Sequence, residues 1–468
     1  MAETRRSCDL LFSRGHVLTV DDRREVYENG SVAVVGGRVA DVGPADEVEA
    51  AWTAARTVDC RGKAVVPGFT DGHSHLFQAF ARGLGEGRSI WPWLCDFMWP
   101  YAIAVDPDDA RVAATLGAVE ALRSGITTVI DHHYAPTDAE TVLSVAEALE
   151  RAGLRGAVAR GMVGPRTAVA EARGLPTALF RHSLAEELEL TRACVRARPP
   201  GSRVTVWPAP LNLSYADQDL VRGAVELAAG AGTRWHTHCS EGRKDPESYL
   251  DAYGVRPVGW LAREGLLDGR ATLAHAIWLD DEEIELAGGS GAGVCHNPAS
   301  NAYLASGVMP LRSLREAGAV VALGTDGPSA GHRQDMFEAM KLTLFAQRQE
   351  TLDPAVARCE EALELATREG ARYAGTGAGV LAPGAPADLV VVALDRPHLR
   401  PLHRAVAALV YSARGSDVEM TVVDGRVVFE DGRCTYVDED ALLAEAQERA
   451  ERLVERAGLA KLTVPWQH

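Results

Sequence analysis

The sequence predicts an α/β protein, a (β/α)8 TIM-like barrel with a small β-sandwich built from both ends of the chain. Three observations predict this fold. Eight short apolar runs alternate with stretches of helical spacing over roughly 300 residues, which is the pattern and length of a (β/α)8 barrel. The segments before and after this region are both rich in β-branched residues and turn signals. Each is too short to bury a sound core alone, so we expect the two to pack together.

The two chain ends have the same strand-like texture. The first 60 residues alternate apolar and polar positions, with turn signals at Asn29-Gly30 and Gly36-Gly37. Residues 386–395 and 420–433 carry β-branched runs, and the second includes an Asp424-Gly425 turn. We therefore expect residues 1–62 and 375–437 to form one composite sandwich domain.

The region between them, residues 63–374, is the predicted barrel. Its expected strands are 63–70, 126–131, 154–160, 203–210, 233–239, 271–277, 291–297 and 320–326. Residues 106–124 and 216–232 show helical spacing, with aspartates in their first turns. A doubly wound open sheet is the alternative fold, but such sheets usually have fewer strands. Residues 438–468 are expected to form a C-terminal helical extension, a surface helix that stops at Gly458.

Composition and charge exclude several classes of protein. The 468 residues contain 48 Lys and Arg against 65 Asp and Glu, a formal charge of −17, which disfavours binding to nucleic acids or anionic membrane surfaces. The eight cysteines form no C-x-x-C pair, which is typical of reduced thiols in a cytosol. Neither a secretory signal nor an apolar run of about 20 residues is visible, so we expect a soluble cytoplasmic protein.

Histidines and acids stand at the ends of most expected strands, where a barrel of this kind assembles its active site. His73 and His75 follow the first strand. Side chains alternate along an extended chain, so both imidazoles point to the same side and supply half of a metal site. An isolated H-x-H pair also occurs as ordinary loop or core histidines, but the preceding VVPGFTDG places this pair at a strand mouth.

The fifth strand repeats the spacing with His236 and His238, and Glu241 follows three residues later. A carboxylate just beyond a metal ligand is suitably placed to move protons to and from a metal-bound water. The alternative for Glu241 is a solvent-facing loop acid. We expect His236 to pack or to support a ligand, because about four or five ligands suffice.

The last strands contribute two further candidates. Asp326 closes the eighth strand in ALGTDG, where it can bind the metal and accept a proton, although Asp-Gly is also a common turn. His275 lies in the apolar strand LAHAIWL and is either a core histidine or a group that polarises the substrate.

The motifs VVPGFTDGHSHLFQAFARGL, ALRSGITTVIDHHYAP, HTHCSEGRKDPE, LAHAIWLDD and ALGTDGPSAGH together resemble the amidohydrolase superfamily. The resemblance covers nearly the whole chain. It is to the mononuclear-metal aminohydrolase branch, which includes guanine, 8-oxoguanine and S-adenosylhomocysteine deaminases and the triazine hydrolases. In that branch a barrel is flanked by a sandwich from both chain ends.

The resemblance implies one metal ion per chain, held by His73, His75, His238 and Asp326. It implies Zn²⁺, with Fe²⁺ as the alternative. Members with two metals carry a lysine on the fourth strand, and here that strand reads RVTVWPAP. Catalytic roles carried over are Glu241 as proton shuttle, Asp326 as acceptor of the water proton, and His275 as the group that orients the substrate and holds the adduct.

Substrate-binding candidates are Gln78, Arg82, Trp91, His275 and Ser329. Gln78 and Arg82 resemble family positions that contact substrate, although a salt-bridged surface role is equally open for Arg82. Trp91 belongs to an aromatic segment that suits a planar ring, and core packing is its alternative. Ser329 lies in a segment after the eighth strand that departs from many relatives, so the substrate of any single relative does not transfer.

We therefore predict a hydrolase acting on C–N bonds other than peptide bonds, a metal-dependent deaminase that converts C–NH2 of a purine-, pterin- or pyrimidine-like ring to C=O and ammonia. The alternatives are removal of chloride or alkylamine from a triazine-like ring, a ring-opening cyclic amidohydrolase, and an inactive barrel scaffold. We expect a small planar heterocycle as partner and a homo-oligomer, a dimer or higher.

Overall fold

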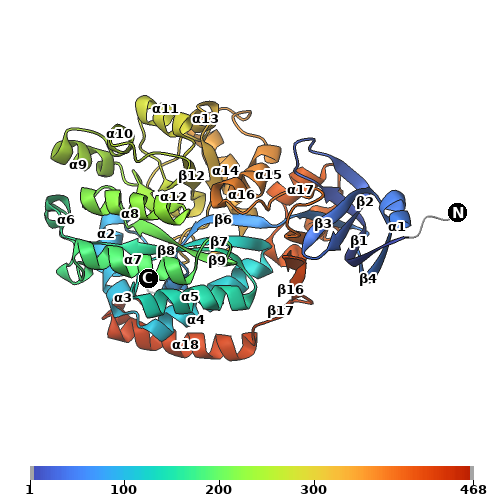
Figure 1. Ribbon diagram of the computed structural model, residues 1–468, viewed down its shortest axis with the longest axis horizontal. Coiled ribbons are helices and arrows are strands. Elements are labelled where there is room, and N and C mark those ends of the chain that lie inside the picture. The colour runs from blue at the N-terminus through green and yellow to red at the C-terminus, as the bar shows by residue number, and fades with distance from the viewer. Residues whose placement is uncertain (1–4, 464–468) are drawn as a thin grey trace, which may run out of the picture.

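The computed structural model describes residues 5–463 and contains the predicted (β/α)8 barrel (Figure 1). Its eight parallel strands overlap all eight predicted ones. They are β6 (Phe69–Ser74), β7 (Ile126–His133), β8 (Arg155–Met162), β9 (Val204–Pro210), β10 (Trp235–Cys239), β11 (Ala271–His275), β12 (Gly293–His296) and β13 (Val320–Leu323). Almost every residue of these strands is buried, which explains their continuous apolar runs.

The barrel consists of two four-stranded halves, β6-β7-β8-β9 and β10-β11-β12-β13. Two isolated bridges join them: Asn212 pairs with His238 at one seam, and Ser74 pairs with Asp326 at the other. Both bridges lie at the carboxyl ends of the strands. His238 and Asp326, two of the expected metal ligands, therefore lie where the two halves of the barrel meet.

Helices surround the strands and cover the mouth of the barrel. The outer helices are α4 (Pro107–Arg123), α5 (Ala139–Ala152), α7 (Leu184–Ala197), α8 (Gln218–Ala231), α10 (Pro257–Arg263), α11 (Asp281–Ser290), α13 (Leu311–Glu316), α14 (Met336–Thr351), α15 (Cys359–Ala366) and α16 (Arg368–Ala374). Shorter elements follow several strands: η1 (Leu76–Ala81), α2 (Ile90–Trp93), η2 (Leu94–Met98), α3 (Trp99–Ala104), α6 (Ala168–Ala172), η3 (Thr177–Leu179), α9 (Lys244–Tyr253) and α12 (Pro298–Tyr303). The expected aspartate caps are present, since Asp106 forms a capping box at α4 and Asp217 caps α8.

Both chain ends contribute to one second sheet of nine strands, as predicted. They are β1 (Arg6–Leu18), β2 (Val26–Val35), β3 (Arg38–Pro44), β4 (Trp52–Asp59), β5 (Lys63–Pro67), β14 (Leu389–Ala393), β15 (Val418–Val423), β16 (Arg426–Glu430) and β17 (Arg433–Cys434). With them lie α1 (Ala45–Ala51), η4 (Pro397–Leu399), α17 (Ala405–Tyr411) and η5 (Gly415–Asp417). Phe12 and Val32 from the start of the chain share a core with Leu389 and Val422 from its end. In Figure 1 the blue and the orange-red segments accordingly lie together beside the barrel.

The predicted strand 63–70 is two strands in the structure. β5 pairs with β1 and β14 in the second sheet, and the barrel begins only at β6. Pro67 and Gly68 cause the break. Proline lacks a backbone N–H for the ladder, and a Cβ on Gly68 would lie 2.3 Å from Oγ1 of Thr127. The first barrel strand therefore begins at Phe69, whereas the expected barrel domain begins at residue 63.

Of the predicted N-terminal turns, Gly36-Gly37 is confirmed and Asn29-Gly30 is wrong. Gly36 and Gly37 connect β2 to β3 with φ of 57° and 79°. Gly30 lies inside β2 and pairs with Gly15 of β1. A Cβ at Gly30 would come within 2.6 Å of the Tyr27 side chain, so glycine is required here for close packing rather than for a turn.

The predicted C-terminal helix is α18 (Glu439–Arg456), followed by η6 (Ala460–Leu462). In Figure 1 it runs along the outside of the barrel beside α4. Arg449 lies 3.4 Å from Oδ1 of Asp109 in α4, and Arg456 pairs with the same carboxylate. Within residues 5–463, every helix is too short or too polar to span a bilayer.

Candidate active site

Four of the predicted metal ligands meet at the mouth of the barrel. His73 and His75 come from the end of β6, His238 from β10, and Asp326 follows β13. Nε2 of His75 lies 3.1 Å from Nε2 of His238. Oδ1 of Asp326 lies 3.3 Å from Nε2 of His75 and 3.4 Å from Nε2 of His73. All four side chains are buried.

Backbone carbonyls fix the orientation of two of these imidazoles. Nδ1 of His75 lies 2.7 Å from the carbonyl oxygen of His132, and Nδ1 of His238 lies 2.6 Å from that of Leu211. A carbonyl oxygen only accepts, so each Nδ1 carries the proton. In the neutral rings Nε2 then carries a lone pair, and the lone pairs of His75 and His238 face each other.

His73 is oriented by a chain of side chains. Thr272 donates its hydroxyl to the carbonyl oxygen of Trp235, so its oxygen accepts from Nδ1–H of His236 at 2.9 Å. Nε2 of His236 is therefore free to accept from Nδ1–H of His73 at 2.8 Å. This leaves a lone pair on Nε2 of His73, which has no hydrogen-bond partner among the described residues. His236 thus orients the imidazole of His73.

This donor set fits a divalent metal ion. Burial keeps the imidazoles neutral: it lowers the pKa of His75 to about 3 and also lowers that of His73 and His238. Three buried lone pairs and a carboxylate gathered at one strand mouth repel each other unless a cation lies between them. The separations of 3.1 Å for His75–His238, 3.3 Å for His75–Asp326 and 3.4 Å for His73–Asp326 are close to the roughly 3.3 Å expected between donors around a tetrahedral zinc ion.

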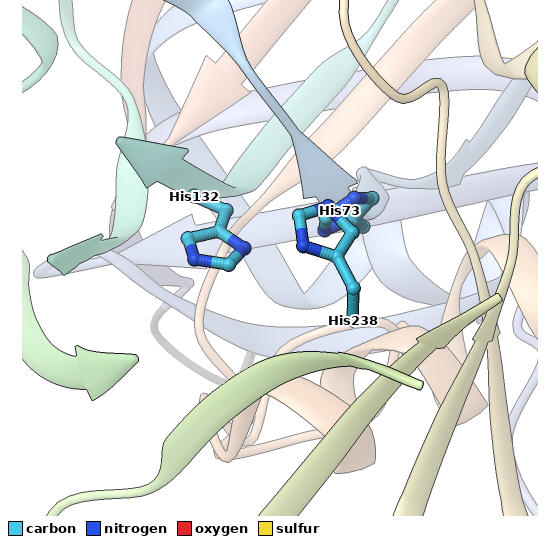
Figure 2. A group of neighbouring side chains, drawn as sticks. All are labelled: His73, His132 and His238. Carbon is cyan, nitrogen blue, oxygen red and sulfur yellow. The ribbon is translucent and has the colours of Figure 1, made fainter. Parts of the chain in front are cut away.

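His132, near the end of β7, belongs to the same cluster. Figure 2 shows its ring beside those of His73 and His238, and the ligand atoms of these three residues lie within 4.8 Å of one another. Its ring is stacked on that of His238 with centroids 4.7 Å apart. Both of its ring nitrogens are buried without a hydrogen-bond partner among the described residues.

Asp326 is held in its ionised form. Ser300 donates its hydroxyl to Oδ2 at 2.5 Å, and the backbone N–H of Gly327 donates to Oδ1 at 2.7 Å. Burial opposes the charge, but the neighbouring imidazoles of His73, His275 and His75 outweigh burial and hold the pKa of Asp326 well below its usual range. The backbone of Asp326 is in the left-handed region at φ 60°, a strained conformation that often marks functional residues.

Glu241 and His275 approach Asp326 from neighbouring strands. Nε2 of His275 lies 3.6 Å from Oε2 of Glu241 and 3.7 Å from Oδ2 of Asp326. Burial raises the pKa of Glu241 to about 7. Burial opposes a charge on His275, but the two carboxylates outweigh burial and raise its pKa. Oδ1 of Asn301 lies 2.9 Å from Nδ1 of His275, and Oγ of Ser306 lies 3.5 Å from Oε1 of Glu241.

A cavity opens directly over these groups. Its walls include His75, His238, Glu241, His275 and Asp326. Gln78 also lines it and donates from Nε2 to the hydroxyl of Tyr134 at 2.8 Å. Ser329 is fully buried behind the wall and donates its hydroxyl to Oε1 of Gln78. Of the substrate-binding candidates, Gln78 and His275 therefore face the cavity directly, and Ser329 supports Gln78.

The structure places Arg82 and Trp91 away from the cavity wall. Arg82 is 37% exposed and pairs with Glu120 on the outer helix α4, the arrangement of the salt-bridged surface alternative. Trp91 is covered by the guanidinium of Arg173, 4.0 Å from its ring centroid. Aromatic residues from the same segment, Trp93 and Trp99, line the cavity in its place.

Sequence reasoning missed one segment, residues 297–306. Ser300, Asn301 and Ser306 approach Asp326, His275 and Glu241 respectively, although these three belong to different strands. The motif HNPASNAYLASG begins with His296-Asn297 at the end of the predicted seventh strand. Its position at the mouth of the barrel could have indicated that its polar side chains lie near the active site. Serine and asparagine are also ordinary helix-cap residues, so the motif alone does not indicate their partners.

Comparison with known proteins agrees with this geometry. Residues 64–428 match the model of the amidohydrolase family. A 5-methylthioadenosine/S-adenosylhomocysteine deaminase from Symbiobacterium thermophilum is 36% identical over 449 residues, 95% of this chain and 99% of the relative. A 5′-deoxyadenosine deaminase from Methanosarcina mazei is 30% identical over 448 residues, 96% of this chain and 99% of the relative.

A solved structure is also similar over nearly its full length. The crystal structure of an adenosine deaminase from Xanthomonas campestris with bound zinc superposes with a TM-score of 0.89 at 26% sequence identity, covering 97% of this chain and 100% of that one. The family match spans more than half of the chain and includes every residue of the metal cluster. The chain therefore belongs to the amidohydrolase family, in its aminohydrolase branch, and is a hydrolase acting on C–N bonds other than peptide bonds.

Proposed function

We propose that the protein is a zinc-dependent hydrolytic deaminase, which replaces the amino group of a purine-like N-heterocycle by oxygen and releases ammonia. The observation that carries the proposal is the convergence of Glu241, His275 and Asp326 beside the histidine cluster, on the wall of one cavity. The related chains named above are deaminases of adenine nucleosides, which supports a purine-like ring.

His73, His75, His238 and Asp326 would hold one zinc ion per chain. A zinc ion bound there supplies Lewis-acid chemistry that lowers the pKa of water toward neutrality. Asp326, kept ionised by Ser300 and the Gly327 amide, accepts the proton of the attacking water at Oδ2.

Two further residues complete the reaction. Glu241, with a pKa near 7, is protonated in a large fraction of molecules at neutral pH and donates from Oε2 to a ring nitrogen, which makes the adjacent carbon electrophilic. His275, whose pKa the neighbouring Glu241 and Asp326 raise, donates from Nε2 in its protonated form to the oxygen that develops negative charge. Asp326 then returns its proton to the amino group as the C–N bond breaks and ammonia leaves, and the hydroxyl proton of the adduct passes to Glu241, which restores its acid form as the C=O bond forms.

The decisive experiment is a product assay with the purified, zinc-loaded chain on amino-substituted purines, pterins, pyrimidines and triazines. We expect ammonia in a one-to-one ratio with the hydroxylated or oxo product. Chloride or alkylamine from triazines as the main product would replace the proposal with the alternative, a hydrolase that removes chloride or alkylamine from a triazine-like ring. An absence of any product would leave the scaffold alternative.

Glu241→Gln tests the proton shuttle. The variant should retain one equivalent of zinc and lose at least about 100-fold in kcat, because the amide cannot donate and regain a proton. Glu247→Gln is the matched control, since Glu247 is exposed six residues further along on α9. Full turnover by Glu241→Gln would contradict the assigned role.

We further propose that the chain works in the cytoplasm as a homo-oligomer. All eight cysteines are free thiols, which supports a reducing compartment. Sedimentation of the zinc-loaded protein tests the oligomeric state, and a monomer at micromolar concentration would refute that part.

A further inference from the structure

The walls of the cavity beyond the reacting groups are mainly apolar. Ile90, Trp93, Leu94 and Trp99 approach from the segment after β6, Leu211 from the loop after β9, and Leu304 from the end of α12. Flat aromatic and branched aliphatic side chains bury a planar ring and its hydrocarbon substituents well. None of them offers a partner for a charge, although the indole N–H groups of Trp93 and Trp99 are buried without a hydrogen-bond partner among the described residues.

The two side-chain amides on the wall are largely occupied. Gln78 donates to Tyr134 and accepts from Ser329, so both ends of its amide are bonded to protein. Oδ1 of Asn212 accepts from the backbone N–H of Ser214 at 2.8 Å and from its hydroxyl at 2.6 Å. What remains is the amide N–H groups of Asn212, the hydroxyls of Tyr134 and Tyr215 and the two indole N–H groups, and none of these is a free carboxylate or carbonyl acceptor for a pair of hydroxyls.

Charged side chains near the cavity are already paired elsewhere. Arg173 lies 3.4 Å from Asp245 and donates to the carbonyl oxygen of Lys244 at 2.7 Å. Asp245 also accepts from the backbone N–H of Gly242 at 2.8 Å. Of the described residues that line the cavity, the acids are Glu241 and Asp326, and both belong to the reaction.

This lining discriminates between substituents on the ring. A carboxylate or ammonium group on the substrate would be desolvated without a counter-charge, which is strongly unfavourable. The vicinal diol of a ribose is commonly bound by a carboxylate that accepts from its hydroxyls, and the free carboxylates here face the reacting end. A neutral hydrocarbon substituent meets no such penalty.

We infer that the substrate is an amino-substituted N-heterocycle whose remaining substituents are uncharged and mainly apolar, and that nucleosides with an ionised amino-acid tail are poor substrates. The inference rests on the proposed deaminase function and adds the class of substituent to it. It separates this chain from the S-adenosylhomocysteine specificity that the name of one relative carries.

A matched set of ligands with one ring tests the inference. The probes are 9-propyladenine, 9-(2-carboxyethyl)adenine, adenosine and S-adenosylhomocysteine, or the same propyl and carboxyethyl substituents on whichever ring the product assay identifies. Binding is measured by calorimetry on zinc-loaded Glu241→Gln, and kcat/KM is measured on the unaltered chain. We expect the propyl compound to exceed adenosine at least tenfold and both carboxylate-bearing compounds at least 100-fold, in affinity and in kcat/KM.

Equal or better binding of adenosine or of either carboxylate-bearing compound would overturn the inference. Ammonia release from no compound, with the expected order of binding preserved, would overturn the proposed function and leave the inference standing. Ile90, half-buried at the start of α2, offers a variant that should favour the carboxylate-bearing ligand instead. Ile90→Arg should shift the carboxyethyl-to-propyl ratio at least tenfold toward the carboxylate, while Ile90→Met keeps that ratio within twofold; an unchanged ratio in Ile90→Arg counts against the inference.

Discussion

Ser300 Oγ lies 2.5 Å from Asp326 Oδ2, so a helix that follows β12 supports the carboxylate that follows β13. Ser300→Ala removes one of the two donors to this carboxylate. We expect the affinity for zinc to fall about 10- to 100-fold, the usual effect of losing a group that orients a metal ligand. Competition against a chromogenic chelator measures the affinity. Ser313→Ala, at an exposed position on α13, is the control, and an equal loss in both variants would refute the role of Ser300.

Arg82 and Gln78 lie four residues apart and have different surroundings. Arg82→Ala should leave kcat/KM within about twofold, because this side chain forms an exposed ion pair, an interaction of small energy. Gln78→Ala should lower kcat/KM at least about tenfold, since it removes a cavity wall residue bonded to Tyr134. Steady-state kinetics on the two variants measure both changes in kcat/KM. A large loss in Arg82→Ala would restore it as a substrate-binding residue.

Removal of the metal should destabilise the barrel. The proposed ligands come from both four-stranded halves, so a bound ion links the strands across the two seams. At free zinc 100 times above its dissociation constant, the expected stabilisation is about 2.7 kcal/mol. Thermal unfolding with a strong chelator should show a lower Tm that added zinc restores. In His238→Ala the chelator should lower Tm by less, and an undiminished effect there would place the metal elsewhere.

The stability of the fold should decrease as pH rises toward neutrality, partly through Asp131. Burial raises the pKa of Asp131 to about 7, whereas an unfolded aspartate titrates near 3.9. The folded chain therefore retains a proton that the unfolded chain releases, and stability is lost as pH rises through this window, by at most about 1.4 kcal/mol per pH unit. One carboxyl oxygen accepts from the backbone N–H of Leu76 at 2.8 Å and the other lacks a partner among the described residues, an environment that suits a neutral group.

Asp131→Asn provides the measurement for this effect. The amide does not titrate, so the difference in urea midpoint between pH 5 and pH 7 should be smaller in the variant than in the unaltered chain. Asp251→Asn, at an exposed position on α9, should retain the full difference. An identical pH dependence in Asp131→Asn and the unaltered chain would show that Asp131 is ionised in the fold.

Much of the barrel and its metal cluster was predictable, because local patterns carry the information. Buried parallel strands produce continuous apolar runs, and the carboxyl ends of such strands must meet at one mouth. His73, His75, His238 and Asp326 each follow or end such a run, so their convergence follows from the strand pattern. The relation of His236 to His73 has the same origin, since strand alternation brings both rings into the barrel.

The remaining features depend on contacts between distant residues. Arg82 and Gln78 are equally plausible in the sequence, and only the packing of α4 and α18 against η1 decides which faces outward. Gly30 resembles a turn residue until Tyr27 and Val17 close around it. Ser300, Asn301 and Ser306 have hydroxyl and amide groups typical of helix caps. Their partners lie on other strands, and such contacts produce no periodic pattern in the sequence.

The pairing of β5 with β14 affects how the chain is made. Val65 pairs with Val391, so an edge of the second sheet that is formed by residue 67 stays open until about 320 more residues have been synthesised. At roughly 10 residues per second this takes about half a minute on the ribosome. During that time β5 exposes unpaired backbone groups beside a valine-rich face, a template for aggregation. The nascent chain is therefore most dependent on chaperones before β14 emerges, and slowed translation of the barrel region should lower the yield of folded protein.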